Sequence, residues 1–147
     1  MGRYYIKKHY KTVGEYPAAE GIHFTRRAAG VARRFAECDG FLLYEAGQRD
    51  NKGPVGAKCV YGWGVAVDGP LEAVEPRVAN GKEYPLVVPV KVEKRLADKT
   101  RGIPLMLLRE EFGIQMRPTL GGVLEIPERV YLALKERIDS LKEEENA

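Results

Sequence analysis

The chain contains few of the residues that build metal sites, disulfides and serine active sites. Its 147 residues include two cysteines, two histidines and one serine. Cys38 and Cys59 have neither a CxxC spacing nor the spacing of a zinc site, and His9 and His23 stand apart in the sequence. Ser140 lies in a predicted helix without the context of a nucleophile elbow. We therefore expect no metal, no cofactor and no serine-based catalysis.

Long apolar runs and phosphate-binding glycine motifs are also missing. No stretch is long and apolar enough to span a bilayer, and the residues after Met1 lack the apolar region of a signal peptide. Neither a dinucleotide-binding fingerprint nor a Walker sequence is present. The length is typical of one domain. The sequence thus predicts a single cytoplasmic domain over residues 1–147 that has no membrane partner.

Charge is distributed unevenly along the chain, although the net charge is only +3. Residues 1–60 contain eleven Lys and Arg against six Asp and Glu, whereas residues 61–147 contain thirteen against fifteen. Such asymmetry indicates one basic face, which would attract an anionic partner. The alternative is a solvated surface whose charge happens to be uneven.

Hydrophobic periodicity and turn residues predict more strands than helices. Because the strands do not alternate regularly with helices, we expect an α+β fold with a small, curved, mostly antiparallel sheet. Glu75–Gly81 reads as a turn. The predicted strands span about 4–8, 41–44, 55–67, 84–92 and 123–126, and the predicted helices span about 25–38, 103–112 and 127–141.

The first predicted helix has an apolar face and a separate basic face. At about 100° per residue, its four arginines fall within one arc around Gly30, which has no side chain to obstruct a ligand. The arginines either contact a nucleic-acid backbone or are simply solvated. The apolar positions are Phe24, Ala28, Val31 and Phe35, and the basic positions are Arg26, Arg27, Arg33 and Arg34.

Aromatic residues concentrate on the two strands that follow this helix. Tyr61 and Trp63 are two residues apart, so both rings point to one strand face if no bulge intervenes. A base stacked on such a ring gains about 1–3 kcal/mol, but both rings can instead pack in the core. Tyr44 and Glu45 end the preceding strand, where the carboxylate can accept a hydrogen bond from a base amino group. The polar loop between these strands adds two candidate phosphate contacts, Arg49 and Lys52.

These segments together resemble the PUA-like superfamily, and within it the EVE domains, which are related to the ASCH and YTH domains. The resemblance covers most of the chain, although the first strand lacks the tryptophan usual in the family. It implies a PUA-like pseudobarrel of five or six strands with flanking helices. It also implies a base-binding pocket that includes Tyr44 and Trp63, with Arg26, Arg33 and Arg34 at its mouth. The segments that carry the resemblance are Tyr4–Ile6, Asp39–Tyr44, Gly56–Val67, Leu86–Val92 and Arg117–Ile126.

Three hypotheses about function follow. The first is a nucleic-acid-binding module, for RNA or DNA or a nucleotide-like small molecule, that reads a modified base in a pocket of Tyr44, Glu45, Tyr61 and Trp63. The second is an ASCH-type RNA or nucleoside hydrolase, whose chemistry would need groups such as Lys7, Lys58, Tyr44 and Glu45 to converge. The third is a protein-interaction module that forms a homodimer through an edge strand near 84–92. The sequence favours binding over catalysis.

Overall fold

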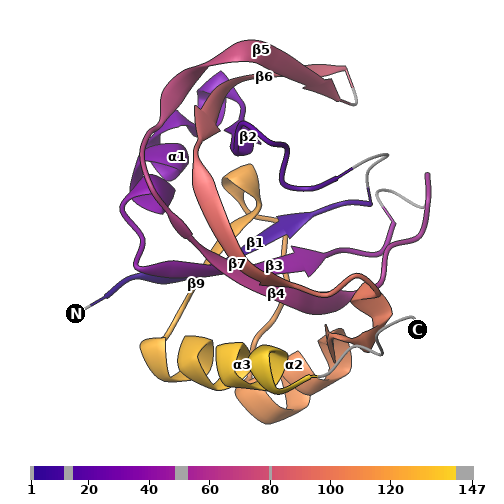
Figure 1. Cartoon of the computed structure of the whole chain (residues 1–147). Helices are drawn as coiled ribbons and strands as arrows, with labels where there is room; N and C mark the ends of the chain where they lie inside the picture. Colours follow the sequence, from indigo (N-terminus) through magenta and orange to yellow (C-terminus); the bar gives the residue numbers. More distant parts are fainter. Residues whose placement is uncertain (1, 12–14, 49–52, 80, 142–147) are drawn as a thin grey trace, which may run out of the picture.

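Two β-sheets and three α-helices make up the described part of the chain (Figure 1). The computed structural model describes residues 2–11, 15–48, 53–79 and 81–141. Within these ranges, nine strands divide between a six-stranded and a three-stranded sheet, and they do not close into a barrel. The predicted α+β class is therefore confirmed.

The larger sheet is mostly antiparallel, with one parallel pair at its centre. The parallel pair is β1 (Tyr4–His9) with β3 (Gly40–Glu45), and the helical segment between them provides the crossover that a parallel connection needs. Every residue of β3 is buried, which agrees with its apolar sequence. The strand order is β7 (Val90–Arg95), β4 (Cys59–Ala66), β3, β1 and β9 (Val123–Ile126), and β8 (Ile103–Pro104) pairs with β4.

The smaller sheet continues the larger one, because the antiparallel ribbon that β4 and β7 form bends and extends into it. It contains β2 (Ile22–Phe24), β6 (Lys82–Val88) and β5 (Leu71–Ala79), in that order. The single strand predicted over 84–92 is in fact two strands, because Pro89 lacks an N–H group and the chain changes sheets there. The predicted turn over 75–81 is wrong for residues 75–79, which belong to β5. The ribbon therefore folds the β5–β6 hairpin over one face of the larger sheet (Figure 1).

Helices cover both faces of the larger sheet (Figure 1). A 3-10 turn at Arg26–Ala28, capped by the Thr25 hydroxyl, leads into α1 (Ala29–Ala36), on the same side as the smaller sheet. On the opposite side lie α2 (Leu105–Phe112), which ends at Gly113 in the left-handed conformation as predicted, and α3 (Glu128–Ser140). Two further 3-10 turns span Lys99–Arg101 and Leu120–Gly122. No helix in the described ranges has the length and apolar character needed to cross a membrane.

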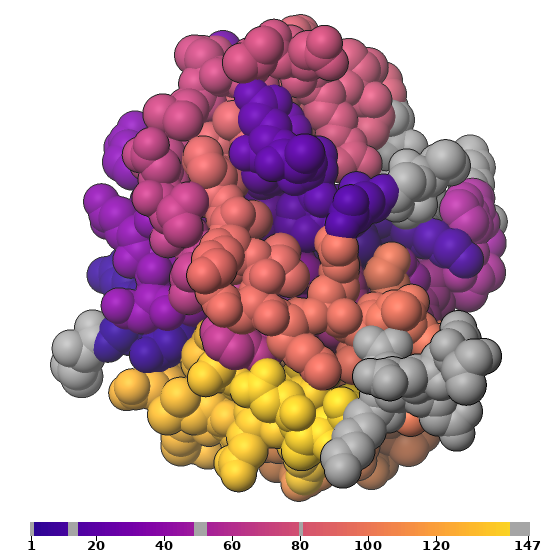
Figure 2. All heavy atoms as spheres, viewed as in Figure 1, coloured from indigo at the N-terminus to yellow at the C-terminus, as the bar shows by residue number. Residues whose placement is uncertain are grey.

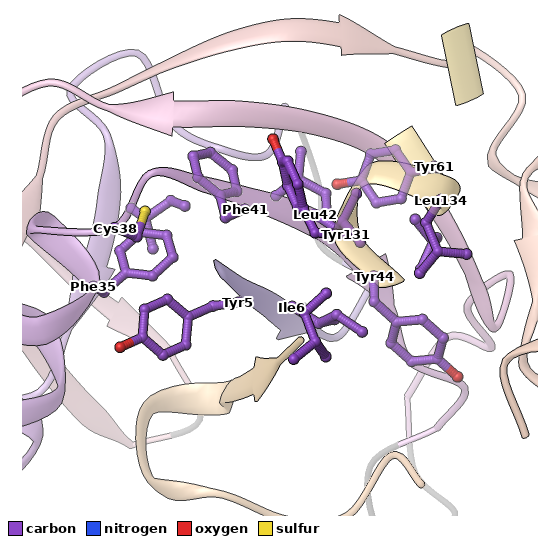
Figure 3. Close-up of a cluster of buried hydrophobic side chains, with 14 of the residues drawn as sticks. Tyr5, Ile6, Phe35, Cys38, Phe41, Leu42, Tyr44, Tyr61, Tyr131 and Leu134 are labelled. Carbon is purple, nitrogen blue, oxygen red and sulfur yellow. The ribbon is translucent and has the colours of Figure 1, made fainter. Parts of the chain in front are cut away.

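The core lies between the larger sheet and these covering layers. Phe35 of α1 packs against the rings of Phe24 and Phe41, with ring centroids 5.7 and 5.2 Å away. Figure 3 shows Phe35 and Phe41 of this cluster together with Tyr5 and Cys38. In the space-filling view, the segment around β2 lies between the β5–β6 hairpin and β7, and α3 covers the opposite side of the sheet (Figure 2). This arrangement leaves a cleft under the hairpin.

Candidate functional site

A cleft of about 790 Å³ lies where the end of β1 meets β2, the β5–β6 hairpin and the segment before β9. The chain reaches this cleft from positions more than 100 residues apart, since β1 and the segment at 118–122 both line it. The bend of the β4–β7 ribbon is responsible, because it carries residues 77–84 over the end of β1.

The cleft is strongly basic. Among the described residues, six cationic side chains line it against a single carboxylate, that of Glu83. The rings of Tyr10, Tyr16 and Tyr84 also line it, so flat apolar faces stand beside the positive charges. This combination suits a ligand that has both phosphates and planar rings. The cationic residues are Lys7, Lys8, Lys11, Arg27, Arg77 and Lys82.

Lys7 is buried at the wall of this cleft. Its ammonium donates a hydrogen bond to the Lys8 carbonyl over 2.9 Å and lies 5.5 Å from the centre of the Phe24 ring. Burial, with smaller contributions from the positive charges of Lys8 and Arg77, lowers the pKa of Lys7 to about 7. A substantial fraction of the Lys7 amine is therefore neutral near physiological pH.

A network of aromatic and imidazole rings lies beside Lys7. The His9 ring stacks on Tyr16 with centroids 3.9 Å apart, and Arg77 lies over the Tyr16 ring at 5.8 Å. The Nδ1 atom of His9 is 2.8 Å from the Tyr10 carbonyl, which can only accept, so Nε2 accepts the hydrogen bond from the Tyr61 hydroxyl. Burial lowers the pKa of His9 to about 4, so this imidazole is neutral.

Two consecutive glycines form the wall opposite the hairpin. Both Gly121 and Gly122 have positive φ angles, of 72° and 69°. A Cβ atom at Gly122 would lie 2.6 Å from the Lys8 carbonyl oxygen and 3.1 Å from the Lys7 Nζ atom. Glycine at 122 therefore permits the close approach of this turn to β1, and it leaves the space next to the Lys7 amine without a side chain.

The tyrosines predicted to line a pocket are buried in the core. Tyr44 and Tyr61 belong to the hydrophobic cluster and have 2% and 0% of their surface exposed (Figure 3). Burial raises the pKa of Tyr44 to about 12. A bulge in β4 leaves Tyr61 without a partner on β3, between Val60 opposite Tyr44 and Gly62 opposite Leu43. The prediction that these rings form a ligand-accessible face is therefore not met.

Trp63 lies against α3 instead of facing the basic cleft. Its indole N–H donates to the Asp139 carboxylate over 2.7 Å, and the Lys135 ammonium lies 4.3 Å from the ring centroid. The flanking glycines allow β7 to approach closely, since a Cβ atom at Gly64 would lie 2.4 Å from the Lys91 carbonyl oxygen. Trp63 therefore attaches α3 to the sheet.

Glu45 lines a smaller, neighbouring cavity of about 280 Å³, which shares Lys11 with the basic cleft. Its carboxylate forms an ion pair with Lys99 at 2.9 Å and accepts a hydrogen bond from the Ala57 N–H at 2.8 Å. Burial by itself raises the pKa of Glu45, but Lys99 and Ala57 outweigh it and the net pKa is lowered. A carboxylate so paired stabilises the start of β4 and is not placed beside Tyr44 as a base acceptor.

The predicted arginine face is divided. Arg27 lines the basic cleft. Arg26 pairs with the Glu72 carboxylate through two contacts of 2.5 and 3.0 Å, which attaches the start of the helix to β5. Arg33 and Arg34 are exposed on α1 and do not line the cleft. The remaining two predicted contacts, Arg49 and Lys52, lie outside the described residues.

The cleft residues that sequence reasoning missed come from segments without a recognisable motif. Lys8 belongs to a strand predicted only as such, Arg77 lay in a segment interpreted as a turn, and Lys7 was named only for the hydrolase hypothesis and not for binding. Lys7 follows Ile6 and lies on the other face of β1, and both side chains are buried because both faces of this strand are covered. A buried lysine is rare unless it is paired or functional.

No protein-family model matches the chain, and the comparisons with curated proteins and with solved structures also yielded no match. The similarity to the PUA-like superfamily thus stays a prediction. In the described residues, His, Cys, Asp and Glu form no group of three that could hold a metal ion. The function must be argued from the cleft itself.

Proposed function

We propose that this protein binds single-stranded nucleic acid, with the phosphates and one unpaired base held in the basic cleft. The observation that carries the proposal is the lining of the cleft, in which six cations and three tyrosine rings face one hollow. Proteins that bind single strands combine these two features, because cations attract the backbone and rings stack on bases.

The size and position of the cations favour an unpaired strand over a duplex. The cleft volume is typical of a pocket that encloses a ligand of a few hundred daltons, which is the size of one nucleotide. Arg27 on the 3-10 turn and Lys82 on β6 both line the cleft and are exposed, so they can hold phosphates next to an inserted base. Tyr84 on β6 is half-buried and can offer its ring to that base.

We further propose that the fold is a PUA-like, EVE-related variant. The elements on which the resemblance rests occur in the expected order: a first strand, a basic helix, a buried strand, a glycine-rich strand, and a late strand followed by a helix. A modified base is then the ligand that the resemblance suggests for the pocket. Its location would be the cleft at Lys7 and Tyr84, and not the buried positions Tyr44 and Tyr61.

The hydrolase hypothesis has less support from the geometry. Of the four groups suggested for it, only Lys7 lines the basic cleft. Tyr44 is buried, Lys58 is exposed elsewhere, and Glu45 lines the smaller cavity. The interaction hypothesis also changes, because β6 is internal to its sheet and only β7 of that region is an edge strand. We therefore propose binding as the function.

The test is a salt titration of binding to labelled single strands of about 12 nucleotides, as RNA and as DNA. For single strands, log K falls with log salt by about 0.7 per phosphate neutralised. Because Arg27 and Lys82 each face the cleft, the double variant Arg27→Ala/Lys82→Ala should bind more weakly, with the slope reduced by about 1.4.

Arg33→Ala/Arg34→Ala is the matched control, since it removes the same charge from the exposed side of α1. We expect this control to retain the wild-type slope, contrary to the expectation from the sequence alone. If both double variants have the same salt slope, or if the control reduces the slope more, the ligand does not bind in the cleft as proposed. A larger reduction in the control would place the ligand on α1. Absence of salt-dependent binding by the wild-type protein would refute the proposed function.

A further inference from the structure

The Lys7 amine differs from the other cations of the cleft in its surroundings. It is 6% exposed, and the described residues place no carboxylate within ion-pair distance of it. Its hydrogen bond goes to a backbone carbonyl, which does not compensate a positive charge as a carboxylate would. The amine is therefore held at the cleft wall as a group that loses its proton easily.

The positive charges next to Lys7 also favour loss of its proton. Lys8 on β1 and Arg77 on β5 are the nearby positive charges that disfavour its protonation. Arg27 adds a further charge from the 3-10 turn, and His9 is neutral. Glu83 on β6 is the single carboxylate of the cleft, and it is exposed. His23 also lines the cleft and is paired through Nε2 with Glu20 at 3.2 Å.

We propose that Lys7 is a nucleophile that forms a Schiff base with an aldehyde carried by a phosphate-bearing ligand in the cleft. This inference rests on the proposed function and names its substrate class. The neutral Nζ attacks the aldehyde carbon and gives a carbinolamine. Loss of water then leaves an imine between Nζ and that carbon. No oxidant or reductant is needed, and water is the leaving group.

The geometry leaves room for this reaction. Lys7 and Gly122 both line the cleft, and since a Cβ atom at Gly122 would lie 3.1 Å from Nζ, glycine at this position leaves no side chain there to shield the amine from a ligand. The surrounding cations, Lys8, Arg77 and Lys82, are placed to hold the phosphates of the same ligand. A desolvated lysine beside other cations is a known arrangement for amine nucleophiles.

Two sources supply an aldehyde next to phosphate. One is a nucleic-acid strand with an abasic deoxyribose, whose open-chain form exposes an aldehyde between two phosphodiesters. The other is a small phosphorylated aldehyde, for which glyceraldehyde 3-phosphate serves as a probe. The experiment compares both, with and without an excess of an intact strand as competitor.

The experiment traps the imine with sodium cyanoborohydride, which delivers hydride to the imine carbon and leaves a stable secondary amine. Peptide mass mapping then locates the adduct in the wild-type protein, so the result does not depend on the folding of a variant. We expect the adduct on Lys7 to exceed that on exposed Lys91 of β7 by more than about tenfold at neutral pH, because the neutral fraction is larger. Lys7→Arg should abolish this adduct, whereas Lys91→Arg should leave it intact.

The outcomes separate this inference from the proposed function. Adducts spread over exposed lysines, or an unchanged adduct yield in Lys7→Arg, would overturn the assignment of Lys7 as a nucleophile. If intact strands still bind with the predicted salt slope in that case, the proposed binding function stands without the nucleophile. A Lys7 adduct with the abasic strand that an intact strand suppresses supports both proposals. An adduct with glyceraldehyde 3-phosphate but no binding of strands supports the nucleophile and overturns the nucleic-acid function.

Discussion

The burial of Lys7 makes a specific prediction about stability and pH. The folded protein holds this amine with a pKa of about 7, whereas the reference value for an unhindered lysine is 10.5. Between these values the unfolded chain binds more protons at this position than the folded chain does. The free energy of unfolding should therefore rise with pH across this window, and the contribution of Lys7 is lost as pH falls toward 7.

The magnitude follows from the two pKa values. From pH 7 to 9.5 the gain integrates to about 3 kcal/mol, because each unit contributes about 1.4 kcal/mol once the folded amine is mostly neutral. Lys7→Met removes the titrating group while keeping an unbranched side chain. The difference in unfolding free energy, wild type minus Lys7→Met, should thus increase by about 3 kcal/mol over this range.

Urea unfolding at several pH values, followed by circular dichroism, measures this difference. Subtraction of the variant cancels the titration of the buried tyrosines and cysteines, which are common to both proteins. Lys91→Met provides the corresponding comparison for an exposed lysine of β7. If the unfolding free energies of wild type and Lys7→Met change in parallel with pH, Lys7 remains charged in the folded state. The conclusion that the cleft lowers the pKa of Lys7 would then be wrong.

Two further predictions concern the turn before β9 and the single tryptophan. Gly122→Ala should destabilise the fold by about 1–3 kcal/mol, because φ is positive and the Cβ atom would meet the Lys8 carbonyl oxygen. Gly30→Ala should instead stabilise the fold by about 0.5–1 kcal/mol, because a Cβ atom at this position of α1 meets no close contact. Thermal unfolding of the two variants measures both effects. Trp63→Phe should lower stability by about 1–3 kcal/mol through the lost hydrogen bond to Asp139, yet leave strand affinity unchanged. A loss of affinity without loss of stability would restore Trp63 to the binding site.

Much of the secondary structure could be predicted because it depends on local patterns. The strand over 123–126 and the last helix appear where the apolar spacing indicates them. The continuous apolar segment after Gly40 forms the buried strand β3. The errors occur at prolines and bulges, as at Pro89, where pairing with a distant strand decides whether the chain continues or changes sheets.

The candidate site could be predicted only in its chemistry. A basic surface beside aromatic rings was expected, and the cleft has both, but of the described residues predicted for the binding site only Arg27 lines it, together with Lys7, which was named only for the hydrolase hypothesis. The prediction placed Tyr61 and Trp63 on one accessible face by strand alternation. The bulge at Tyr61 interrupts that alternation, and α3 covers Trp63.

The amino-acid sequence by itself determined the mixed α+β character, the basic N-terminal half and the burial of a strand with no polar interruptions, because each depends on composition or short-range periodicity. The tertiary structure alone decided which cations share a cavity. The bend of the long ribbon at Pro89 brings Arg77 and Lys82 over the end of β1, and the glycine turn at 121–122 closes against it from the other side. Lys7 acquires its low pKa only in the folded state, because burial is the largest cause and the charge of Arg77, a residue distant in the chain, adds to that of the adjacent Lys8.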